Sequence, residues 1–234
     1  MLLFFLRHGD PIYDPDSLTP LGRRQAEALG KRLAVYGIDE IYASSSNRAI
    51  ETSAPACELM HKEAQILDWC NEGHAWCELT VSDGNGQRWY FQDEQSLELF
   101  VTQDMADLGK SWYDHPYFDG TKAKEGFLRI KRHADEFLLS LGYEHVGNAY
   151  KAISPNDKRI ALFAHQGFGL AFLRAVLDIP YPAFCSKFDM GHSAMTVIEF
   201  SGDRTVIPKV LQLSNDSHIY KEGLPTEYQN RIKF

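Results

Sequence analysis

The sequence predicts one α/β domain: a three-layer α/β/α sandwich around a mainly parallel sheet of about six strands, with an inserted subdomain. Apolar runs of strand length alternate with helical patterns along most of the chain, and this order produces parallel sheets with helices on both faces. Residues 73–147 interrupt the alternation, so we interpret them as the inserted subdomain. The length of 234 residues fits a single domain, residues 1–234, better than two catalytic domains.

The chain opens with a strand pattern followed by a capped helix. Residues 2–6 are all apolar, which is typical of a strand covered on both faces. Thr19 is placed to cap a helix in which Pro20 is the first residue, and apolar residues then recur at helical spacing until Gly37. A second strand is expected at residues 38–43.

The later elements continue the same alternation. Serine is a good N-cap, so a second helix is expected to start after the serines at 44–46 and to reach about His61. The other expected elements are a strand at 64–67, a helix near 127–141, a strand at 159–164, a helix at 169–177, and strands at 195–200 and 206–213. A Ser-Gly-Asp turn separates the last two strands, which we expect to pair as a hairpin or at an edge of the sheet.

Composition and charge exclude several classes of protein. With 44% hydrophobic and 24% charged residues, the chain has the composition of a folded protein. Its formal net charge of -8 disfavours a nucleic-acid partner. No apolar run approaches the roughly 20 residues that a membrane span requires, and the opening apolar run lacks the basic residues and the length of a signal peptide. We therefore expect neither nucleic acid nor a membrane as a partner.

The cysteines predict a reducing compartment. The chain has four of them, Cys57, Cys70, Cys77 and Cys185. They form no CxxC pair and no closely spaced group with histidine, which is typical of reduced thiols rather than of zinc ligands or a disulfide framework. We therefore expect a cytoplasmic protein. The sequence is compatible with a homodimer but does not specify the oligomeric state.

Polar residues follow three of the predicted strands. They form the motifs Arg7-His8-Gly9, Ser44-Ser45-Ser46-Asn47-Arg48 and His165-Gln166-Gly167. In open α/β sheets, ligands bind outside the carboxyl ends of the strands, where the N-termini of the following helices favour anions. Guanidinium groups fit phosphate oxygens, and an imidazole can act as a nucleophile. Each residue alone would more often form a surface ion pair or a structural hydrogen bond, but their combination predicts a phosphate site.

These motifs resemble those of the histidine phosphatase superfamily, which has a phosphoglycerate-mutase-like fold. The resemblance is carried by Leu6-Arg7-His8-Gly9, by residues 18–26 and 45–52, and by Ala164-His165-Gln166-Gly167. It implies that His8 attacks phosphorus in line and forms a phosphohistidine, which water then hydrolyses. It also implies that Arg7, Arg48 and His165 hold the phosphoryl oxygens while an acidic residue protonates the leaving oxygen. Residues 73–147 match no motif of the family.

Physical chemistry supports these roles. His8 can attack only if one ring nitrogen is unprotonated, which requires the other nitrogen to donate to an acceptor such as a backbone carbonyl. Gly9 would allow the chain to approach closely at this point. Arg7, Arg48 and a protonated His165 would stabilise the charge that spreads over the transferring oxygens. Neither a metal ion nor any other cofactor is then required.

Two residues are candidates for the acid, and one further histidine is a candidate for binding phosphate. The family's acidic residue follows the third strand, where this chain has Asp68 and Glu72. We favour Glu72, because a longer side chain beyond the strand end reaches the crevice more readily, and Asp68 is the alternative. The resemblance assigns a phosphate contact to His192, although a histidine there could also cap its loop. Asp10 could bind substrate or cap the loop after the first strand.

The middle segment is rich in aromatic residues. All four tryptophans fall in it or next to it: Trp69, Trp76, Trp89 and Trp112. A small inserted subdomain must bury apolar surface, so one interpretation is a satellite core. The other is a lid over the crevice, where aromatic side chains would favour a phosphomonoester with an apolar or planar body. We take a lid-like subdomain as the prediction for residues 73–147.

The prediction that follows is a metal-independent histidine acid-type phosphatase that hydrolyses small-molecule phosphomonoesters. A phosphoglycerate-type mutase is the nearest alternative, and it would need extra cations for a substrate carboxylate. The cations that the insertion offers are Arg88, Lys110, Lys122 and Lys124. A non-catalytic phosphate-binding module is a second alternative. A metallohydrolase using His8, His165 and His192 is disfavoured, because Arg7 would repel the cation and no HExxH motif is present.

Overall fold

A six-stranded sheet forms the centre of the protein. The structure is a computed structural model and describes residues 1–82 and 86–225. The strands of this sheet are β1 (Leu2–Arg7), β4 (Glu40–Ser44), β5 (Ala64–Leu67), β10 (Arg159–Ala164), β11 (Met195–Glu199) and β13 (Lys209–Asn215). Their order is β13-β11-β1-β10-β4-β5, with β11 antiparallel to the other five strands. The predicted six-stranded, mainly parallel sheet is therefore confirmed.

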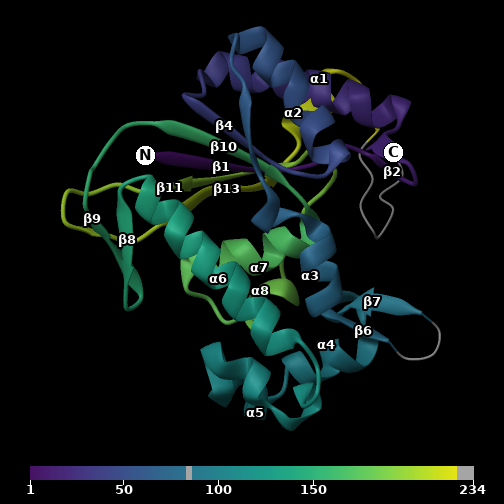
Figure 1. The fold of residues 1–234 in the computed structure, drawn as a ribbon, viewed down its shortest axis with the longest axis vertical. Helices are drawn as coiled ribbons and strands as arrows, with labels where there is room; N and C mark the ends of the chain where they lie inside the picture. Colours follow the sequence, from purple (N-terminus) through teal and green to yellow (C-terminus); the bar gives the residue numbers. More distant parts are fainter. Residues whose placement is uncertain (83–85, 226–234) are drawn as a thin grey trace.

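Two pairs of helices cover the two faces of this sheet, which confirms the three-layer sandwich (Figure 1). Their bounds are α1 (Pro20–Tyr36) and α2 (Asn47–Met60) on one face, and α6 (Ala123–Ser140) and α7 (Gln166–Leu177) on the other. Alternation along β1 divides its side chains between the faces. Phe4 joins the apolar cluster that contains residues of α1 and α2, whereas Phe5 packs on Phe168 and Phe172 of α7. The continuous apolar run of β1 is thus buried on both sides.

The first two helices begin with different kinds of cap. Thr19 caps α1 and Gly37, with a φ of 71°, ends it, as predicted. Ser46 occupies the N-cap position of α2, as predicted, but its side chain makes no capping hydrogen bond. The carboxylate of Asp16 instead accepts from the backbone N of Asn47 at 2.7 Å. The start of α2 therefore depends on a residue that is distant in the sequence.

Helix α7 begins earlier than predicted. It starts at Gln166 rather than at residue 169, so Gly167 lies inside its first turn. A Cβ atom at Gly167 would lie 2.5 Å from the ring of Trp89. This glycine therefore serves close packing against the middle segment and does not mark a helix boundary.

The sequence patterns did not reveal most of the short elements. Of these, β2 and β3 form a hairpin directly after β1, and β12, β9 and β8 form a small separate sheet. The strands are β2 (Pro11–Tyr13), β3 (Asp16–Leu18), β6 (Thr80–Ser82), β7 (Gln87–Trp89), β8 (Tyr143–Val146), β9 (Ala149–Ala152) and β12 (Thr205–Val206). The helices are α3 (Glu72–Glu78), α4 (Glu94–Phe100), α5 (Gln103–Leu108), α8 (Tyr181–Cys185) and α9 (Ser217–Lys221). Four 3₁₀ turns are η1 (Asp68–Cys70), η2 (Tyr90–Gln92), η3 (Gly109–Asp114) and η4 (Pro116–Phe118).

Most aromatic residues of the middle segment are buried. Trp112 is fully buried, and its ring centroid lies 4.8 Å from that of Phe118 and 5.0 Å from that of Tyr181 on α8. These side chains belong to the same apolar cluster as the residues of α6 and α7, so they form an extension of the main core. A lid-like role for residues 73–147, of which 83–85 lie outside the described residues, stays a prediction.

Two further observations concern the state of the cysteines and the length of the helices. All four cysteines are free, and two of them, Cys70 and Cys185, are buried. Within the two described ranges, the structure contains no helix with the length and apolarity needed to cross a membrane.

A charged network joins α6, the β8–β9 hairpin and the end of α7. The two ring nitrogens of His145 lie 2.7 Å from Asp135 Oδ1 and 2.5 Å from Asp178 Oδ2. Lys131 and Lys110 each lie 2.6 Å from one of these carboxylates. Hydrogen bonding to Asp135 is the main cause that raises the pKa of His145. Two carboxylate acceptors require two N–H donors, so this histidine is charged when the network is complete.

Replacing His145 by phenylalanine is expected to reduce stability in a pH-dependent way. The variant retains a ring to stack on Tyr150 but loses both hydrogen bonds, which costs about 2 kcal/mol. Because the folded-state pKa lies above the unfolded value of about 6.5, the stabilisation by His145 is complete below that value and is lost as pH rises through the folded pKa. Urea unfolding between pH 5.5 and 9 measures this difference.

The matched control is His133→Phe, a partly exposed histidine on α6, the helix that carries Asp135. This control is expected to change stability by less than about 0.5 kcal/mol. A loss for His145→Phe that is the same at every pH would contradict a charged His145.

Candidate active site

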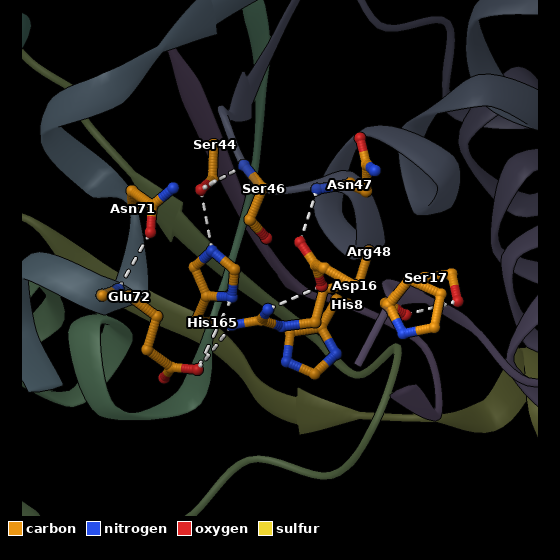
Figure 2. Close-up of polar contacts among 12 residues, drawn as sticks. His8, Asp16, Ser17, Ser44, Ser46, Asn47, Arg48, Asn71, Glu72 and His165 are labelled. Carbon is orange, nitrogen blue, oxygen red and sulfur yellow. Dashed lines mark hydrogen bonds and ion pairs between the residues drawn. The ribbon is translucent and has the colours of Figure 1, made fainter. Parts of the chain in front are cut away.

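The carboxyl ends of four parallel strands bring the predicted site residues together. The sheet register places Arg7 beside Ala164 and Ser44 beside Leu67. The segments that follow β1, β4, β5 and β10 therefore leave the sheet at one edge, where Figure 2 shows the side chains of His8, Arg48, Glu72 and His165 pointing toward one another. The loop before antiparallel β11 carries His192 to the same edge, because its ring centroid is 5.7 Å from that of His8.

His8 is buried and is held as a neutral imidazole. Its Nδ1 lies 2.7 Å from the carbonyl oxygen of Gly9, and since a carbonyl can only accept, Nδ1 carries the hydrogen and Nε2 keeps its lone pair. Burial is the largest cause that lowers the pKa of His8 well below its usual range, and electrostatic interactions with His165, Arg7 and Arg48 lower it further. The ring is therefore unprotonated at neutral pH, as a nucleophile must be.

Close backbone packing holds the loop that carries His8. A Cβ atom at Gly9 would lie 2.6 Å from the carbonyl oxygen of Gly22 on α1, so only glycine allows this approach. The backbone N of Gly9 donates to Thr52 Oγ1 at 3.0 Å, and the Thr52 hydroxyl donates to the carbonyl of Arg48 at 2.6 Å. The nucleophile loop is thus tied to both α1 and α2.

Arg48 is fixed by two carboxylates on opposite sides. Its side chain is 11% exposed, with NH1 2.8 Å from Asp16 Oδ1 and NH2 3.2 Å from Glu72 Oε2. The ring of Tyr13 covers the guanidinium, with its centroid 5.5 Å from Cζ. One planar guanidinium therefore joins the β2–β3 hairpin to α3.

Arg7 is oriented by the loop before β11. Its NH1 donates to the carbonyl of Met190, and its NH2 donates to His192 Nε2 at 2.9 Å. His192 Nδ1 lies 3.5 Å from Asp10. Burial and the charge of Arg7 lower the pKa of His192 to about 3, so this ring is a neutral acceptor. In this geometry His192 positions Arg7, and its direct contact with phosphate stays a prediction.

His165 lies beside both Ser44 and His8. Its Nε2 lies 2.7 Å from Ser44 Oγ, and its ring centroid is 5.3 Å from that of His8. Burial, followed by the charges of Arg48 and Arg7, lowers its pKa well below the usual range. An anion bound between the arginines would favour the charged form of this ring. A protonated His165 in contact with a phosphoryl group therefore stays a prediction.

The two candidate acids lie in different environments. Glu72 is 13% exposed, its Oε1 accepts from the backbone N of Gly167 at 2.9 Å, and its Oε2 lies 3.6 Å from His165 Nδ1. Asp68 is 73% exposed and binds Ser45 and His74 outside the cluster. The structure thus brings Glu72, and not Asp68, beside His8, while the role of either residue stays a prediction.

Several buried donors in the site lack a partner. Within residues 1–82 and 86–225, no hydrogen-bond acceptor is present for Arg7 Nε, Arg48 Nε or His165 Nδ1, and the Ser46 hydroxyl is also unpaired. Buried polar groups without partners are costly and uncommon. A group with several acceptor oxygens, such as a phosphoryl group, would satisfy these donors together.

The same cluster could in principle hold a cation. Ligand atoms of His8, Glu72 and His165 all lie within 4.8 Å of one another. The two guanidinium groups next to them would repel a metal ion, and Glu72 already accepts from Arg48 and Gly167. The electrostatics therefore favour an anion at this place.

Sequence reasoning missed the residues that hold the charged groups in place. Asp16, Ser44 and Thr52 each contact a predicted site residue. Ser44 and Thr52 lie in segments that the sequence had singled out, so their proximity could have been inferred. Asp16 lies in the loop after β1, and no pattern there predicts a hairpin that reaches α2.

The site combines a buried neutral imidazole with unpaired donors at the carboxyl ends of parallel strands. This combination is typical of α/β proteins that bind a phosphate-like anion. The chain belongs to the histidine phosphatase superfamily: the family described as histidine phosphatase superfamily (branch 1) matches residues 3–212. This match covers almost the whole chain and confirms the resemblance carried by the motifs.

Solved structures share the fold at low sequence identity. A phosphoserine phosphatase from Entamoeba histolytica, in complex with 3-phosphoglyceric acid, is 19% identical with a TM-score of 0.61, covering 93% of this chain and 98% of that chain. A mycobacterial glucosyl-3-phosphoglycerate phosphatase is 18% identical with a TM-score of 0.60, covering 91% and 98%. An alpha-ribazole phosphatase from Shigella flexneri is 17% identical with a TM-score of 0.58, covering 92% and 97%. No curated protein matches the chain.

Replacing Arg48 by lysine is expected to weaken binding of inorganic phosphate at least about tenfold. A lysine keeps the charge, but its ammonium cannot contact two carboxylates on opposite sides and also present a third donor inward. Isothermal titration calorimetry with inorganic phosphate measures the dissociation constant. The control is Arg23→Lys, which changes an exposed ion pair with Glu51 and is expected to have little effect. Equal affinity in the native protein and Arg48→Lys would contradict the importance of the guanidinium geometry.

Proposed function

We propose that the protein hydrolyses small-molecule phosphomonoesters through a phosphohistidine intermediate on His8. One observation carries this proposal: the unprotonated Nε2 of a buried His8 lies in a cluster where Arg7, Arg48 and His165 present unpaired donors. A nucleophile beside preorganised donors meets the needs of phosphoryl transfer. The solved structures of the same fold are named as phosphatases of phosphoserine, glucosyl-3-phosphoglycerate and alpha-ribazole, which also supports a small phosphomonoester.

In the first step, His8 Nε2 forms a bond to phosphorus while the bond from phosphorus to the leaving oxygen breaks. Glu72 donates a proton to that oxygen, and the product alcohol departs. Arg48 and Gly167 both donate to this carboxylate. A bound phosphoryl group takes over hydrogen bonds from Arg48, which frees Glu72 to pass a proton from solvent to the leaving oxygen.

In the second step, water attacks the phosphohistidine. Glu72 accepts a proton from that water, the bond between phosphorus and Nε2 breaks, and inorganic phosphate leaves. Arg7, Arg48 and His165 stabilise the equatorial oxygens in both steps. The guanidinium groups supply the charge that a metal ion supplies in other phosphatases, so the proposal is a metal-independent histidine acid-type phosphatase.

The mutase alternative is less well supported by the placement of cations. Lys110 binds Asp178 in the His145 network, and Lys124 binds Asp114 on the surface. Neither lysine is in position to bind a substrate carboxylate beside His8. A cytoplasmic location and the absence of nucleic-acid or membrane partners belong to the same proposal, and the free cysteines are in keeping with a reducing compartment.

A screen of phosphomonoesters in the presence of a chelator tests the proposal. Replacing His8 by alanine is expected to lower kcat by more than about 1,000-fold, because the nucleophile is lost. Rapid quench of the native protein with labelled substrate should trap a phosphate label that is labile in acid and stable in base. No turnover of any phosphomonoester would indicate a binding module, and an acid-stable label on serine would contradict the intermediate on His8.

Replacing Glu72 by glutamine is expected to have an effect that depends on the leaving group. Protonation matters most for a poor leaving group, so kcat for an alkyl phosphate should fall about 100-fold, and kcat for nitrophenyl phosphate by much less. The matched control is Asp68→Asn, a carboxylate outside the cluster. If Asp68→Asn shows the selective loss and Glu72→Gln does not, the acid is Asp68.

A further inference from the structure

The position of the acid determines where the body of the substrate lies. This inference rests on the proposed function. In an in-line displacement the leaving oxygen is opposite His8 Nε2, and it must be within hydrogen-bond reach of Glu72. The organic body attached to that oxygen therefore extends past the start of α3, on the side of Glu72 that faces away from His8.

Two tryptophans lie close to Glu72 in the fold. Glu72 is the first residue of α3, and Trp76 follows four residues later, on the same face of the helix. The centroid of the Trp76 ring is 5.0 Å from that of Trp89. Trp89 in turn packs against Gly167, whose backbone N donates to Glu72. Trp76 is only partly buried, so part of this residue is exposed about one helical turn from Glu72.

Another aromatic side chain lies over Arg48, the ion-pair partner of Glu72. The ring of Tyr13 contacts the guanidinium of Arg48, and the side chain is still 68% exposed. The hairpin that carries Tyr13 is anchored by Asp16, which accepts from both Arg48 and the start of α2. Tyr13 is therefore an exposed ring on a fixed support, rather than a residue of a free loop.

The charges around these rings disfavour an acidic body. Arg48 is already bound by Asp16 and Glu72, and both carboxylates would repel a second anionic group. Arg88 precedes Trp89 in β7, and successive side chains of a strand point to opposite faces. Because Trp89 packs against α7, the side chain of Arg88 lies on the face away from α7. A planar or apolar body makes better use of the exposed aromatic surface.

We propose that Trp76 and Tyr13 determine specificity by contacting the leaving group, and that the preferred substrates are phosphomonoesters with a planar aromatic body. The two rings act on the body of the substrate, while Arg7, Arg48 and His165 act on its phosphoryl group. The preference is therefore expected in kcat/KM for the whole ester and not in the affinity for inorganic phosphate.

Three alkyl phosphates test this proposal. Benzyl, cyclohexylmethyl and ethyl phosphate all release primary alcohols, but only benzyl phosphate has a planar aromatic body. The expected order of kcat/KM is benzyl, then cyclohexylmethyl, then ethyl, with about a tenfold difference between the first and the last. Trp76→Leu should reduce kcat/KM for benzyl phosphate about fivefold and leave ethyl phosphate within about twofold. Tyr13 also covers Arg48, so Tyr13→Leu is expected to lower both values, with a loss about fivefold larger for benzyl than for ethyl phosphate.

Two controls make the test selective. Tyr220→Leu removes an exposed tyrosine on α9 and should change none of the three values. Tyr13→Phe keeps the ring and should retain the preference for benzyl phosphate. Loss of the preference in this variant would mean that the hydroxyl group, and not the ring, is responsible.

The outcomes separate this inference from the proposed function. Turnover of all three esters with no preference, or equal losses for benzyl and ethyl phosphate in Trp76→Leu, would overturn the inference and leave the phosphatase intact. A higher kcat/KM for 3-phosphoglycerate than for benzyl phosphate, lost in Arg88→Ala, would also overturn it and would indicate an acidic body. No turnover of any ester would instead refute the proposed function.

Discussion

The site depends on the burial of two guanidinium groups against three imidazole rings. A buried charge costs several kcal/mol unless it is paired, and Arg48 is paired with Asp16 and Glu72 while Arg7 has a carbonyl and a neutral His192 as acceptors. The positive charges, together with burial, keep the imidazole of His8 unprotonated. One electrostatic arrangement therefore provides both an unprotonated imidazole and a set of donors that suit an anion.

That arrangement needs support from parts of the chain that carry no chemistry. The β2–β3 hairpin brings Asp16 to Arg48 and to the start of α2, and the loop before β11 brings His192 to Arg7. The middle segment contributes in the same way, because Trp89 packs on Gly167, and the backbone N of Gly167 donates to Glu72. Residues from these three separate regions thus hold the groups within a few ångströms of one another.

The middle segment has two kinds of aromatic residue. Trp112 and its neighbours extend the core beneath α6 and α7, where they stabilise the fold. Trp76 lies instead in α3, four residues after Glu72, and is only partly buried. The satellite core and the proposed contact with substrate therefore involve different residues, and they do not exclude each other.

The sequence by itself determined the sheet, its main helices and the positions of Arg7, His8, Arg48 and His165, because apolar periodicity and strand ends are local signals. It also selected Glu72, although spacing alone left Asp68 open. The tertiary structure decided which of these two carboxylates lies in the site, because the burial and hydrogen bonding of each side chain depend on what packs against α3. It also placed the carboxylate of Asp16 at the start of α2 and lowered the pKa of His165, because both follow from contacts between residues far apart in the chain. No local pattern records such contacts, and so only the folded chain specifies the charges of the site.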